Sequence, residues 1–358
     1  MRLLFINSSL TGGGSERAMT LLANESVRYG HVVEMLLVRN KEKTYEIDPS
    51  IRLKELHYSS HNKFSILAER MHGIRGAVRD FKPDCVISFM WDINIIVLLS
   101  LLGVKTNVII SERAFSNSPR RNKAIKFLEY FTCLKARQVV YQTDYAKSIG
   151  PKTAESKSVV IPNMVVAPKG KGNKKELENR IVSVGRLTPQ KNFKLLINSF
   201  KDLLDTHPEF ILEIYGEGDL RDELSSQIKE LGITDSVRLK GYVSDVTSRI
   251  QSAYMFVLPS DYEGISNAMI EAMSLGLAVI CTDCPVGGAA AMINDKKNGI
   301  LVPVNDQNEL SSSMRLLADD AVLAKQLGDA AREVIVDYSP ETVFKKWNAL
   351  FDKMISYR

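Results

Sequence analysis

The chain opens with an apolar run, a glycine-rich turn and a helix-like segment, and this order restricts it to folds built on parallel strands. Residues 2–8 (RLLFINS) are followed by a turn at 11–14 (TGGG) and by apolar residues at helical spacing, which end at Gly30. A second apolar run, 32–38, comes next. Because parallel neighbours require a crossover, usually a helix, this order predicts the opening of an α/β domain.

The same alternation continues through the rest of the chain in two series. Further strand-like runs lie at 85–90, 107–111 and 138–142, and then at 181–184, 210–215, 237–239, 255–259, 278–282 and 300–302. A polar, glycine-containing stretch at 166–178 separates the two series and predicts a linker. We therefore expect two Rossmann-like, doubly wound parallel-sheet domains, 1–165 and 179–340, and a C-terminal helix, 341–358, that packs back toward the first domain.

Composition places this chain of 358 residues among ordinary globular proteins, with 45% hydrophobic and 25% charged residues. Its four cysteines are scattered, which predicts a reducing, cytoplasmic location rather than a disulfide framework. The apolar run 85–104 is long enough to cross a membrane, but Asp92 and Asn94 interrupt it, so we expect a buried strand and helix there.

Charge is divided unevenly between the two halves of the chain. The net charge of +5 combines +9 over residues 1–165 with −4 over the remainder. The first half therefore favours an anionic ligand or surface, whereas nothing in the pattern indicates binding of nucleic acid.

Open parallel sheets bind ligands beyond the carboxyl ends of their strands, so two such domains in tandem predict one cleft lined by turns from both. One candidate is the first turn, where the amides of Gly13 and Gly14 precede a helix and favour a phosphate. The turn lacks the lysine and hydroxyl residue of a P-loop, and Arg17 replaces the third glycine of a dinucleotide fingerprint. A plain tight turn is the alternative.

A second candidate turn, 185–192 (GRLTPQKN), carries two cations. Arg186 and Lys191 lie between a strand and a helix that Asn192 can cap. Such a pair neutralises a diphosphate without a metal, since arginine forks two oxygens and lysine adds a point charge. Solvated surface charge is the alternative explanation.

The third candidate, 261–271 (DYEGISNAMIE), follows an apolar strand and opens a helix. We expect Glu263 at the helix start and Glu271 about two turns inside, too far apart for a glycoside hydrolase pair but suited to the two ends of one elongated ligand. Helix-dipole stabilisation by Glu263 and a solvated Glu271 are the alternative. The residues expected to offer backbone amides or contacts to an anion at this helix N-terminus are Gly264, Ile265, Ser266 and Asn267.

Metal and redox chemistry have weaker support in the sequence. Cys281 and Cys284 form a lone CxxC with no second pair or nearby histidine, and the five histidines show no metal-ligand spacing. Asp261 and Glu263 are the one acidic pair at a metal-binding spacing. We therefore expect no catalytic metal and no cofactor.

Taken together, these motifs resemble a retaining glycosyltransferase of family 4 with the GT-B fold, of the kind that builds bacterial surface polysaccharides and oligosaccharides. The resemblance covers nearly the whole chain and is strongest in the E-x7-E element from Glu263 to Glu271. One departure is 287–291 (GGAAA), where many members carry a glutamate. Further matching segments are 13–17 (GGSER), 161–163 (IPN), 184–187 (VGRL), 191–192 (KN), 215–218 (YGEG) and 298–302 (NGILV).

The resemblance also implies roles for the candidate residues. Arg186 and Lys191 would hold the donor diphosphate, where fixed cations stabilise the charge that develops on the leaving group. Glu263 would position the transferred sugar rather than act as a general base. The remaining implied donor contacts are Glu271 at the ribose, the amides after Glu263 at the distal phosphate, Gly13 and Gly14 from the first domain, and Val243 at the base.

The sequence thus predicts a metal-independent retaining glycosyltransferase that moves a hexose or N-acetylhexosamine from a nucleotide-diphosphate sugar, with UDP as the expected nucleotide. The expected acceptor is a growing glycan, free or lipid-linked, in surface polysaccharide biosynthesis. A sugar-nucleotide epimerase or phosphorylase of the same architecture is an alternative, although the sequence shows neither extra acid/base histidines nor a pyridoxal-lysine motif. A non-catalytic nucleotide-sugar binder is a second alternative.

A basic segment in the first half of the chain is the expected surface for contact with a membrane that carries a lipid-linked acceptor. If the apolar stretch 124–131 (AIKFLEYF) is helical, Ile125, Leu128 and Phe131 share one face beside several cations. We expect peripheral docking on anionic lipid at the inner face of the plasma membrane, with a core-packing helix as the alternative. The cations are Arg113, Arg120, Arg121, Lys123, Lys126, Lys135 and Arg137.

Overall fold

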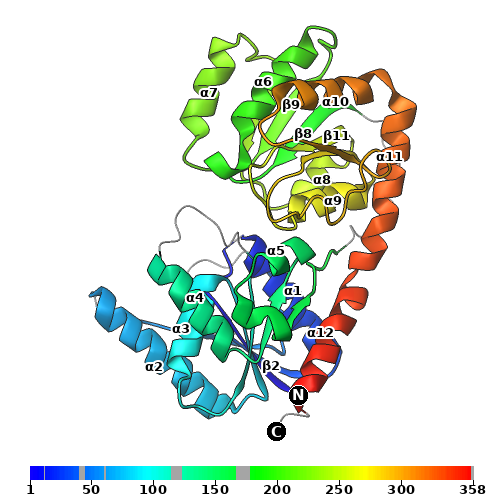
Figure 1. Cartoon of the computed structure of the whole chain (residues 1–358). Coiled ribbons are helices and arrows are strands. Elements are labelled where there is room, and N and C mark those ends of the chain that lie inside the picture. Colours follow the sequence, from blue (N-terminus) through cyan, green and yellow to red (C-terminus); the bar gives the residue numbers. More distant parts are fainter. Residues whose placement is uncertain (12, 40–44, 60–61, 114–122, 167–177, 356–358) are drawn as a thin grey trace. The chain divides into compact units, whose positions relative to one another are not determined.

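A computed structural model describes residues 1–11, 13–39, 45–59, 62–113, 123–166 and 178–355. The chain divides into two compact units (Figure 1). Unit 1 comprises Met1–Met164 and Pro340–Arg358, and unit 2 comprises Val165–Ser339. The expected linker, 166–178, lies almost entirely outside the described residues.

Unit 1 is built on a sheet of seven parallel strands in the order β3-β2-β1-β4-β5-β6-β7. The order reverses direction at β1 and β4, which is the switch point of a doubly wound sheet. The strands are β1 (Arg2–Asn7), β2 (Val32–Leu37), β3 (Arg52–Glu55), β4 (Cys85–Phe89), β5 (Asn107–Ser111), β6 (Gln138–Tyr141) and β7 (Ser158–Val160).

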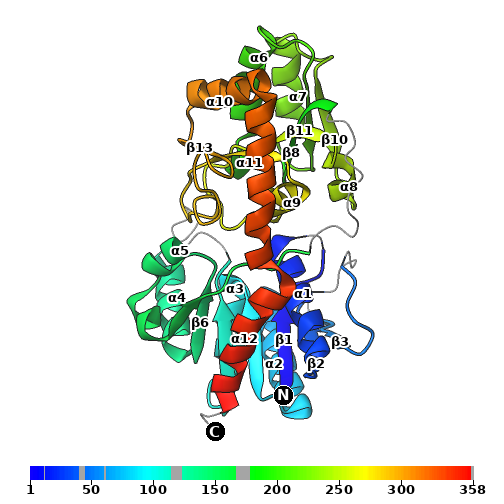
Figure 2. The same ribbon diagram turned by 90° about the vertical axis from the view of Figure 1, so that its right-hand side faces the viewer.

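Helices cover both faces of this sheet. On one face, α1 (Gly14–Arg28) lies beside α12 (Pro340–Ile355), the last helix of the chain (Figure 2). The core there combines buried side chains of α1 and of the sheet with Phe344, Trp347 and Phe351 of α12, so this helix is an integral part of unit 1. The helices of the other face and of the sheet edge are α2 (Lys63–Phe81), α3 (Trp91–Ser100), α4 (Lys123–Lys135) and α5 (Asp144–Ser148).

Unit 2 has a second parallel sheet, of six strands in the order β10-β9-β8-β11-β12-β13, with its switch point between β8 and β11. Separate apolar clusters fill its two faces, one under α6, α7 and α10 and one under α8 and α9. The strands are β8 (Glu178–Val184), β9 (Ile211–Tyr215), β10 (Val237–Gly241), β11 (Ala253–Leu258), β12 (Ala278–Thr282) and β13 (Ile300–Val302). The helices are α6 (Phe193–Leu204), α7 (Arg221–Glu230), α8 (Val246–Ile250), α9 (Asn267–Leu275), α10 (Gln307–Asp319) and α11 (Ala321–Val334).

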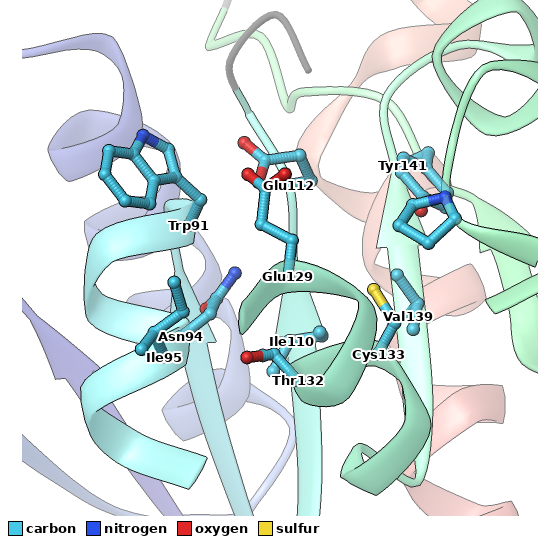
Figure 3. A pocket seen from close by; sticks show the side chains of 11 residues that line it. Trp91, Asn94, Ile95, Ile110, Glu112, Glu129, Thr132, Cys133, Val139 and Tyr141 are labelled. Atoms are coloured by element: carbon cyan, nitrogen blue, oxygen red, sulfur yellow. The ribbon is translucent and has the colours of Figure 1, made fainter. Parts of the chain in front are cut away.

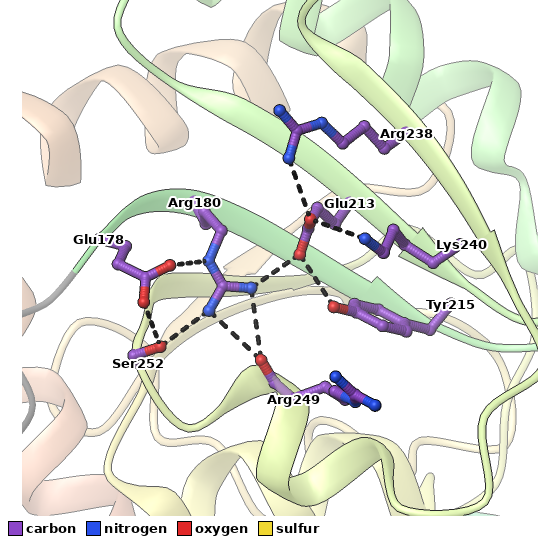
Figure 4. Close-up of polar contacts among 8 residues, drawn as sticks. All are labelled: Glu178, Arg180, Glu213, Tyr215, Arg238, Lys240, Arg249 and Ser252. Carbon is purple, nitrogen blue, oxygen red and sulfur yellow. Dashed lines mark hydrogen bonds and ion pairs between the residues drawn. The ribbon is translucent and has the colours of Figure 1, made fainter.

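A buried ionic network ties the first strands of the second sheet together (Figure 4). The Glu213 carboxylate on β9 accepts hydrogen bonds from Arg180 on β8 at 2.7 Å and from the Tyr215 hydroxyl at 2.8 Å. Arg238 and Lys240 on β10 lie 3.7 and 3.4 Å from its other oxygen. Burial alone would raise the pKa of Glu213, but the hydrogen bonds from Arg180 and Tyr215 outweigh it and hold that pKa below its usual value.

The predicted fold class, two doubly wound parallel-sheet units, is confirmed. Two described strands, β3 and β7, were not expected, since each is short and lies at an edge of the sheet. The run 85–104 forms β4 and α3, as its polar interruptions indicate. Among the described residues, no helix is both long and apolar enough to span a membrane.

Candidate active site

Two of the turns singled out by the sequence come together in unit 2. The first connects β8 to α6 and the second connects β11 to α9, and β8 and β11 are neighbours at the switch point of the sheet. Both turns leave the carboxyl ends of their strands, which is where doubly wound sheets bind ligands. The two turns are far apart in the sequence, but they lie close together because their strands are neighbours in the sheet.

An ion pair joins the two turns directly. The Nζ of Lys191 lies 2.5 Å from Oε2 of Glu263, and the two side chains are 12% and 19% exposed. Gln190 Nε2 at 3.5 Å and Ser260 Oγ at 3.4 Å donate to the same carboxylate oxygen. Sequence reasoning missed Gln190 and Ser260; their positions next to Lys191 and near Glu263 were the available signal.

Backbone and side-chain bonds reinforce this junction. The Asp261 amide donates to the Gln190 carbonyl at 2.9 Å, and Gln190 Nε2 donates back to the Tyr262 carbonyl at 2.9 Å. Asn192 Nδ2 donates to the Asp261 carboxylate at 2.7 Å. Burial raises the pKa of Asp261, against the lowering influence of that hydrogen bond. The two turns therefore behave as one braced unit.

Glycines make this close packing feasible. A Cβ on Gly185 would lie 3.0 Å from Cε of Lys191, so the absence of a side chain lets the lysine stem pass. A Cβ on Gly288 would lie 1.9 Å from the Gly264 carbonyl oxygen, in the turn that carries Glu263. The unusual segment 287–291 (GGAAA) thus packs its second glycine against the Glu263 turn.

Arg186, the other predicted cation, is exposed. It forms no ion pair with any residue in the described part of the chain. Its turn is the one that carries Lys191, so a ligand diphosphate at this turn has two cations within one loop.

Helix α9 begins later than the sequence indicated. Its N-cap is Ser266, whose hydroxyl accepts from the Met269 amide, and its first residue is Asn267. Glu263 therefore lies in the turn before the helix rather than at its start, and Glu271 lies just over one turn inside rather than two. Both expectations were wrong because Ser266 caps the helix, so that α9 begins at Asn267.

The residues after Glu263 differ in how deeply they are buried. Gly264 and Asn267 are half-buried, while Ile265 and Ser266 are buried, the isoleucine side chain within the apolar cluster under α9. Glu271 is 5% exposed, and Thr247 Oγ1 of α8 donates to its carboxylate at 3.4 Å.

Val243 lies in the loop between β10 and α8. Its side chain is partly buried and packs against the apolar cluster that contains Tyr215 and Ile270. The α8 region and α9 therefore place Val243, Thr247 and Glu271 in one part of unit 2. Thr247 was not among the expected site residues, and its place on a short helix gave no sequence signal.

Gly13 and Gly14 belong to unit 1, where Gly13 is the N-cap of α1 and Gly14 its first residue. A Cβ on Gly13 would lie 2.0 Å from a carboxylate oxygen of Glu16, so this acidic side chain folds over the helix start. The acid occupies the position at which an anion was expected.

The cysteines are all buried thiols. Burial raises the pKa of Cys284 to about 11, and that of Cys281 still further, so neither is a reactive thiolate at neutral pH. Across the described ranges, no group of three or more His, Cys, Asp or Glu side chains is arranged to hold a metal ion.

The chain is similar in sequence to known glycosyltransferases. Residues 168–334, which make up most of unit 2, match the family described as Glycosyl transferases group 1. The chain is 26% identical over 361 residues to an α-1,4-N-acetyl-D-galactosaminyltransferase of Campylobacter jejuni that acts on an undecaprenol-diphosphate-linked glycan, with 97% of each chain covered. It is 24% identical over 365 residues to the amylovoran biosynthesis glycosyltransferase AmsD of Erwinia amylovora, covering 98% of this chain and 99% of that one.

A solved structure shows the fold across the whole chain. The S. aureus protein TarM, in a mutant form bound to UDP, α-GlcNAc-glycerol and fondaparinux, matches with a TM-score of 0.84 at 15% identity, covering 98% of this chain and all of that one. The two Rossmann-like units have the GT-B fold. Unit 2 is similar to the group 1 glycosyltransferases, and the relatives that match nearly the whole chain carry glycosyltransferase names.

Proposed function

We propose that this protein is a retaining glycosyltransferase that moves a hexose or N-acetylhexosamine from a UDP-sugar to a growing, lipid-linked glycan in surface polysaccharide biosynthesis. The observation that carries the proposal is the meeting of the Arg186 and Lys191 turn with the Glu263 turn at the switch point of unit 2. Cations and a carboxylate at one strand edge suit a ligand with a diphosphate at one end and hydroxyl groups at the other.

The structure pairs Lys191 with Glu263. A donor diphosphate competes for Lys191, and its binding leaves the Glu263 carboxylate available to accept hydrogen bonds from the sugar. Negative charge grows on the diphosphate as the bond to the sugar breaks, and Lys191 and Arg186 stabilise that charge more in the transition state than before it. In the proposed front-face reaction, the departing phosphate accepts the proton of the acceptor hydroxyl.

The nucleoside would occupy the part of unit 2 around α8 and α9. Val243 offers an apolar contact for the base, and Glu271, held by Thr247, offers a carboxylate for the ribose hydroxyls. The distal phosphate would meet the first turn of α9, where backbone amides and the helix dipole favour an anion. The residues proposed there are Gly264, Ile265, Ser266 and Asn267.

The donor and acceptor classes come from the relatives. One relative transfers N-acetylgalactosamine to an undecaprenol-diphosphate-linked glycan, another takes part in amylovoran biosynthesis, and TarM is seen with UDP. Metal independence follows in this proposal from the two cations, which supply the charge that a divalent ion supplies elsewhere.

Peripheral contact with an anionic membrane is part of the proposal, on a helix face that differs from the expected one. On α4 the half-buried side chains are Ile125, Leu128 and Phe131, whereas Phe127, Tyr130 and Leu134 are 67%, 48% and 50% exposed. The exposed set repeats at helical spacing next to the exposed Lys123 and Lys126, which is the pattern of an interfacial helix. Arg120 and Arg121 lie outside the described residues.

The donor assignment is tested with a panel of UDP-, GDP- and dTDP-sugars, by following nucleotide release and the thermal stabilisation of the purified protein. We expect one UDP-hexose or UDP-N-acetylhexosamine to be hydrolysed slowly and to raise Tm, and Lys191→Ala to lose both effects. A panel in which no nucleotide sugar is cleaved or bound would overturn the proposal.

A further inference from the structure

We propose that Arg113 of unit 1 binds a phosphoryl group of the acceptor. This inference rests on the proposed glycosyl transfer and adds the chemistry of the group that unit 1 recognises. Arg113 comes two residues after the last residue of β5, at the carboxyl edge of the unit 1 sheet. Its side chain is not part of the exposed face of α4 with which the sequence analysis grouped it.

The guanidinium of Arg113 is held rigidly at this edge. It lies over the Phe89 ring at 4.4 Å from the centroid, and its Nε donates to Ser111 Oγ at 2.8 Å. Its Nη1 donates to Asn163 Oδ1, which also accepts from Gln142 Nε2 at 2.9 Å. The other terminal nitrogen, Nη2, donates to none of the described residues. Contacts with the described residues therefore use two of the five N–H donors of the guanidinium, and both N–H groups of Nη2 are among those left for a ligand.

The charge of Arg113 lacks a carboxylate partner within the described part of the chain. Burial lowers its pKa to about 9, and the charge of Glu112 raises it only in part. The Glu112 carboxylate accepts from the Arg113 backbone amide and lines a pocket with Glu129 and Trp91 (Figure 3). Arg180 of unit 2 gives the contrast: it is also shielded from water, but Glu178 and Glu213 pair with it and its pKa is raised.

A partly desolvated cation without a counter-ion is costly unless an anion joins it. Residues 114–122 (AFSNSPRRN), which follow Arg113 in the sequence, contain no acidic residue. An anionic ligand would therefore supply a counter-charge that none of the described residues provides.

The surroundings of Arg113 point to the same kind of ligand. Asn7 ends β1, one residue beyond the pair formed by Ile6 and Ser88, so it lies level with Phe89 at the switch point of the sheet. Its Nδ2 is buried and has no hydrogen-bond partner among the described residues. Met90, which follows β4, has a φ of 73°, a conformation that costs a non-glycine residue energy and is concentrated at functional sites.

The face of the unit 1 sheet on which Arg113 has its contacts also favours an anionic ligand. Ser111 and Phe89 point to the face covered by α1 and α12, and the N-terminus of α1 follows the carboxyl end of β1 at the same edge. The donors gathered there, the Arg113 guanidinium and the Asn7 side-chain amide, match the oxygens of a phosphoryl group, whereas Glu16 already covers the N-terminus of α1. A purely structural Arg113 would clamp the loop at Asn163 without any ligand, and the experiment must separate the two roles.

Tryptophan fluorescence isolates unit 1, because the two tryptophans of the chain, Trp91 and Trp347, both belong to it. Trp347 stacks on Phe89 at 6.0 Å, beneath Arg113. In the full-length Arg186→Ala/Lys191→Ala protein, which lacks the donor cations, we would titrate inorganic pyrophosphate, farnesyl diphosphate and glycerophosphoglycerol. A lipid-diphosphate source predicts tightest binding of farnesyl diphosphate, and a phosphodiester polymer predicts tightest binding of glycerophosphoglycerol.

Adding Arg113→Gln should weaken binding of the preferred phosphate compound at least tenfold, while Arg79→Gln, at an exposed arginine of α2 in unit 1, should leave it unchanged. Equal affinities in the Arg113→Gln and parent proteins, or equal losses in both variants, would overturn the proposal. If Arg113→Gln fails to fold, phenylglyoxal labelling of the unmutated protein gives the answer. Protection of Arg113 by the preferred compound supports the site, and labelling at the same rate with and without it contradicts the site.

These outcomes are separable from those of the donor assay. Loss of the Arg113 site leaves nucleotide release from a UDP-sugar intact. A failed donor panel with intact phosphate binding at Arg113 would remove the proposed function and leave the anion site in place.

Discussion

Lys191 and Glu263 form an ion pair across 72 residues of sequence and so brace the β8–α6 turn against the β11–α9 turn. The proposed diphosphate ligand and the Glu263 carboxylate therefore compete for the same ammonium group. The affinity of the site for a nucleotide diphosphate depends on how readily this internal pair opens.

That competition gives opposite effects on binding and turnover for one variant. Glu263→Gln should tighten UDP binding by up to about tenfold, ~1.4 kcal/mol, because Lys191 loses its internal partner. Its turnover should fall by at least about two orders of magnitude, ~2.7 kcal/mol, because the sugar loses its positioning carboxylate. Calorimetry with UDP and a nucleotide-release assay measure the two quantities.

Lys191→Ala should lower both UDP affinity and turnover, the latter again by about a hundredfold. Lys194→Ala is the matched control, since Lys194 is a lysine of the following helix that pairs with Glu223 on the surface. Near-normal turnover in Lys191→Ala and Glu263→Gln would contradict the site assignment.

Gly288→Ala should impair the site without touching a charged group. The added methyl would lie 1.9 Å from the Gly264 carbonyl oxygen, so the turn that carries Glu263 has to move. We expect a loss of turnover of about tenfold or more, because small displacements of positioning groups are costly. Gly76→Ala, where a Cβ meets no atom within 4 Å, is the control and should leave turnover unchanged.

Activity should persist in a chelator, because Arg186 and Lys191 supply the positive charge at the leaving group. The assay compares nucleotide release with EDTA and with added Mn²⁺. Abolition by EDTA and rescue by Mn²⁺ would instead assign a metal-binding role to Asp261 and Glu263.

Lys126→Glu/Phe127→Ser should reduce cosedimentation with anionic vesicles at low salt by several-fold, since each well-placed cation contributes up to about 1 kcal/mol. Val322→Ser is a matched control, because Val322 of unit 2 is as exposed as Phe127, at 67%. Equal recovery of the parent protein with anionic and neutral vesicles would remove the membrane proposal.

Glu213→Gln should destabilise unit 2 by about 1 to 3 kcal/mol at pH 7, since it weakens the charge-assisted hydrogen bonds from Arg180 and Tyr215, while Arg180 keeps its ion pair with Glu178. The pKa of Glu213 is lowered in the folded protein, so its contribution is present above the pKa of the unfolded chain and is lost as the pH falls through the folded value. The difference in the free energy of unfolding between the parent protein and the variant should therefore become smaller at acidic pH. Circular dichroism follows the melting, and the tryptophan transition of unit 1 should stay unchanged.

The fold and the two turns of the candidate site could be predicted from the sequence, and particular residues show why. Apolar runs such as 107–111 and 278–282 match their strands residue for residue, because central parallel strands are buried on both faces. Open parallel sheets bind ligands beyond the carboxyl ends of their strands, and this rule indicated the turns that hold Lys191 and Glu263. The ion pair between these two residues could not be predicted from the sequence, because it depends on β8 and β11 being neighbours in the sheet.

Two other features could not be predicted locally. The start of α9 depended on which residue of the turn caps it, and Ser266 does so. Arg113 looked like one of a row of surface cations, yet it stacks on Phe89 and bonds to Asn163, fifty residues further along the chain. Its environment is a product of strand order rather than of nearby sequence.

The most direct test of retaining transfer follows the anomeric proton of the sugar first released when the purified protein hydrolyses an α-linked UDP-hexose or UDP-N-acetylhexosamine. We predict that proton NMR detects the α-anomer before mutarotation, with UDP released in equal amount and with both products formed about a hundredfold more slowly by Lys191→Ala. Initial release of the β-anomer would contradict the retaining mechanism, and absence of UDP release across all donors would contradict the assignment as a glycosyltransferase.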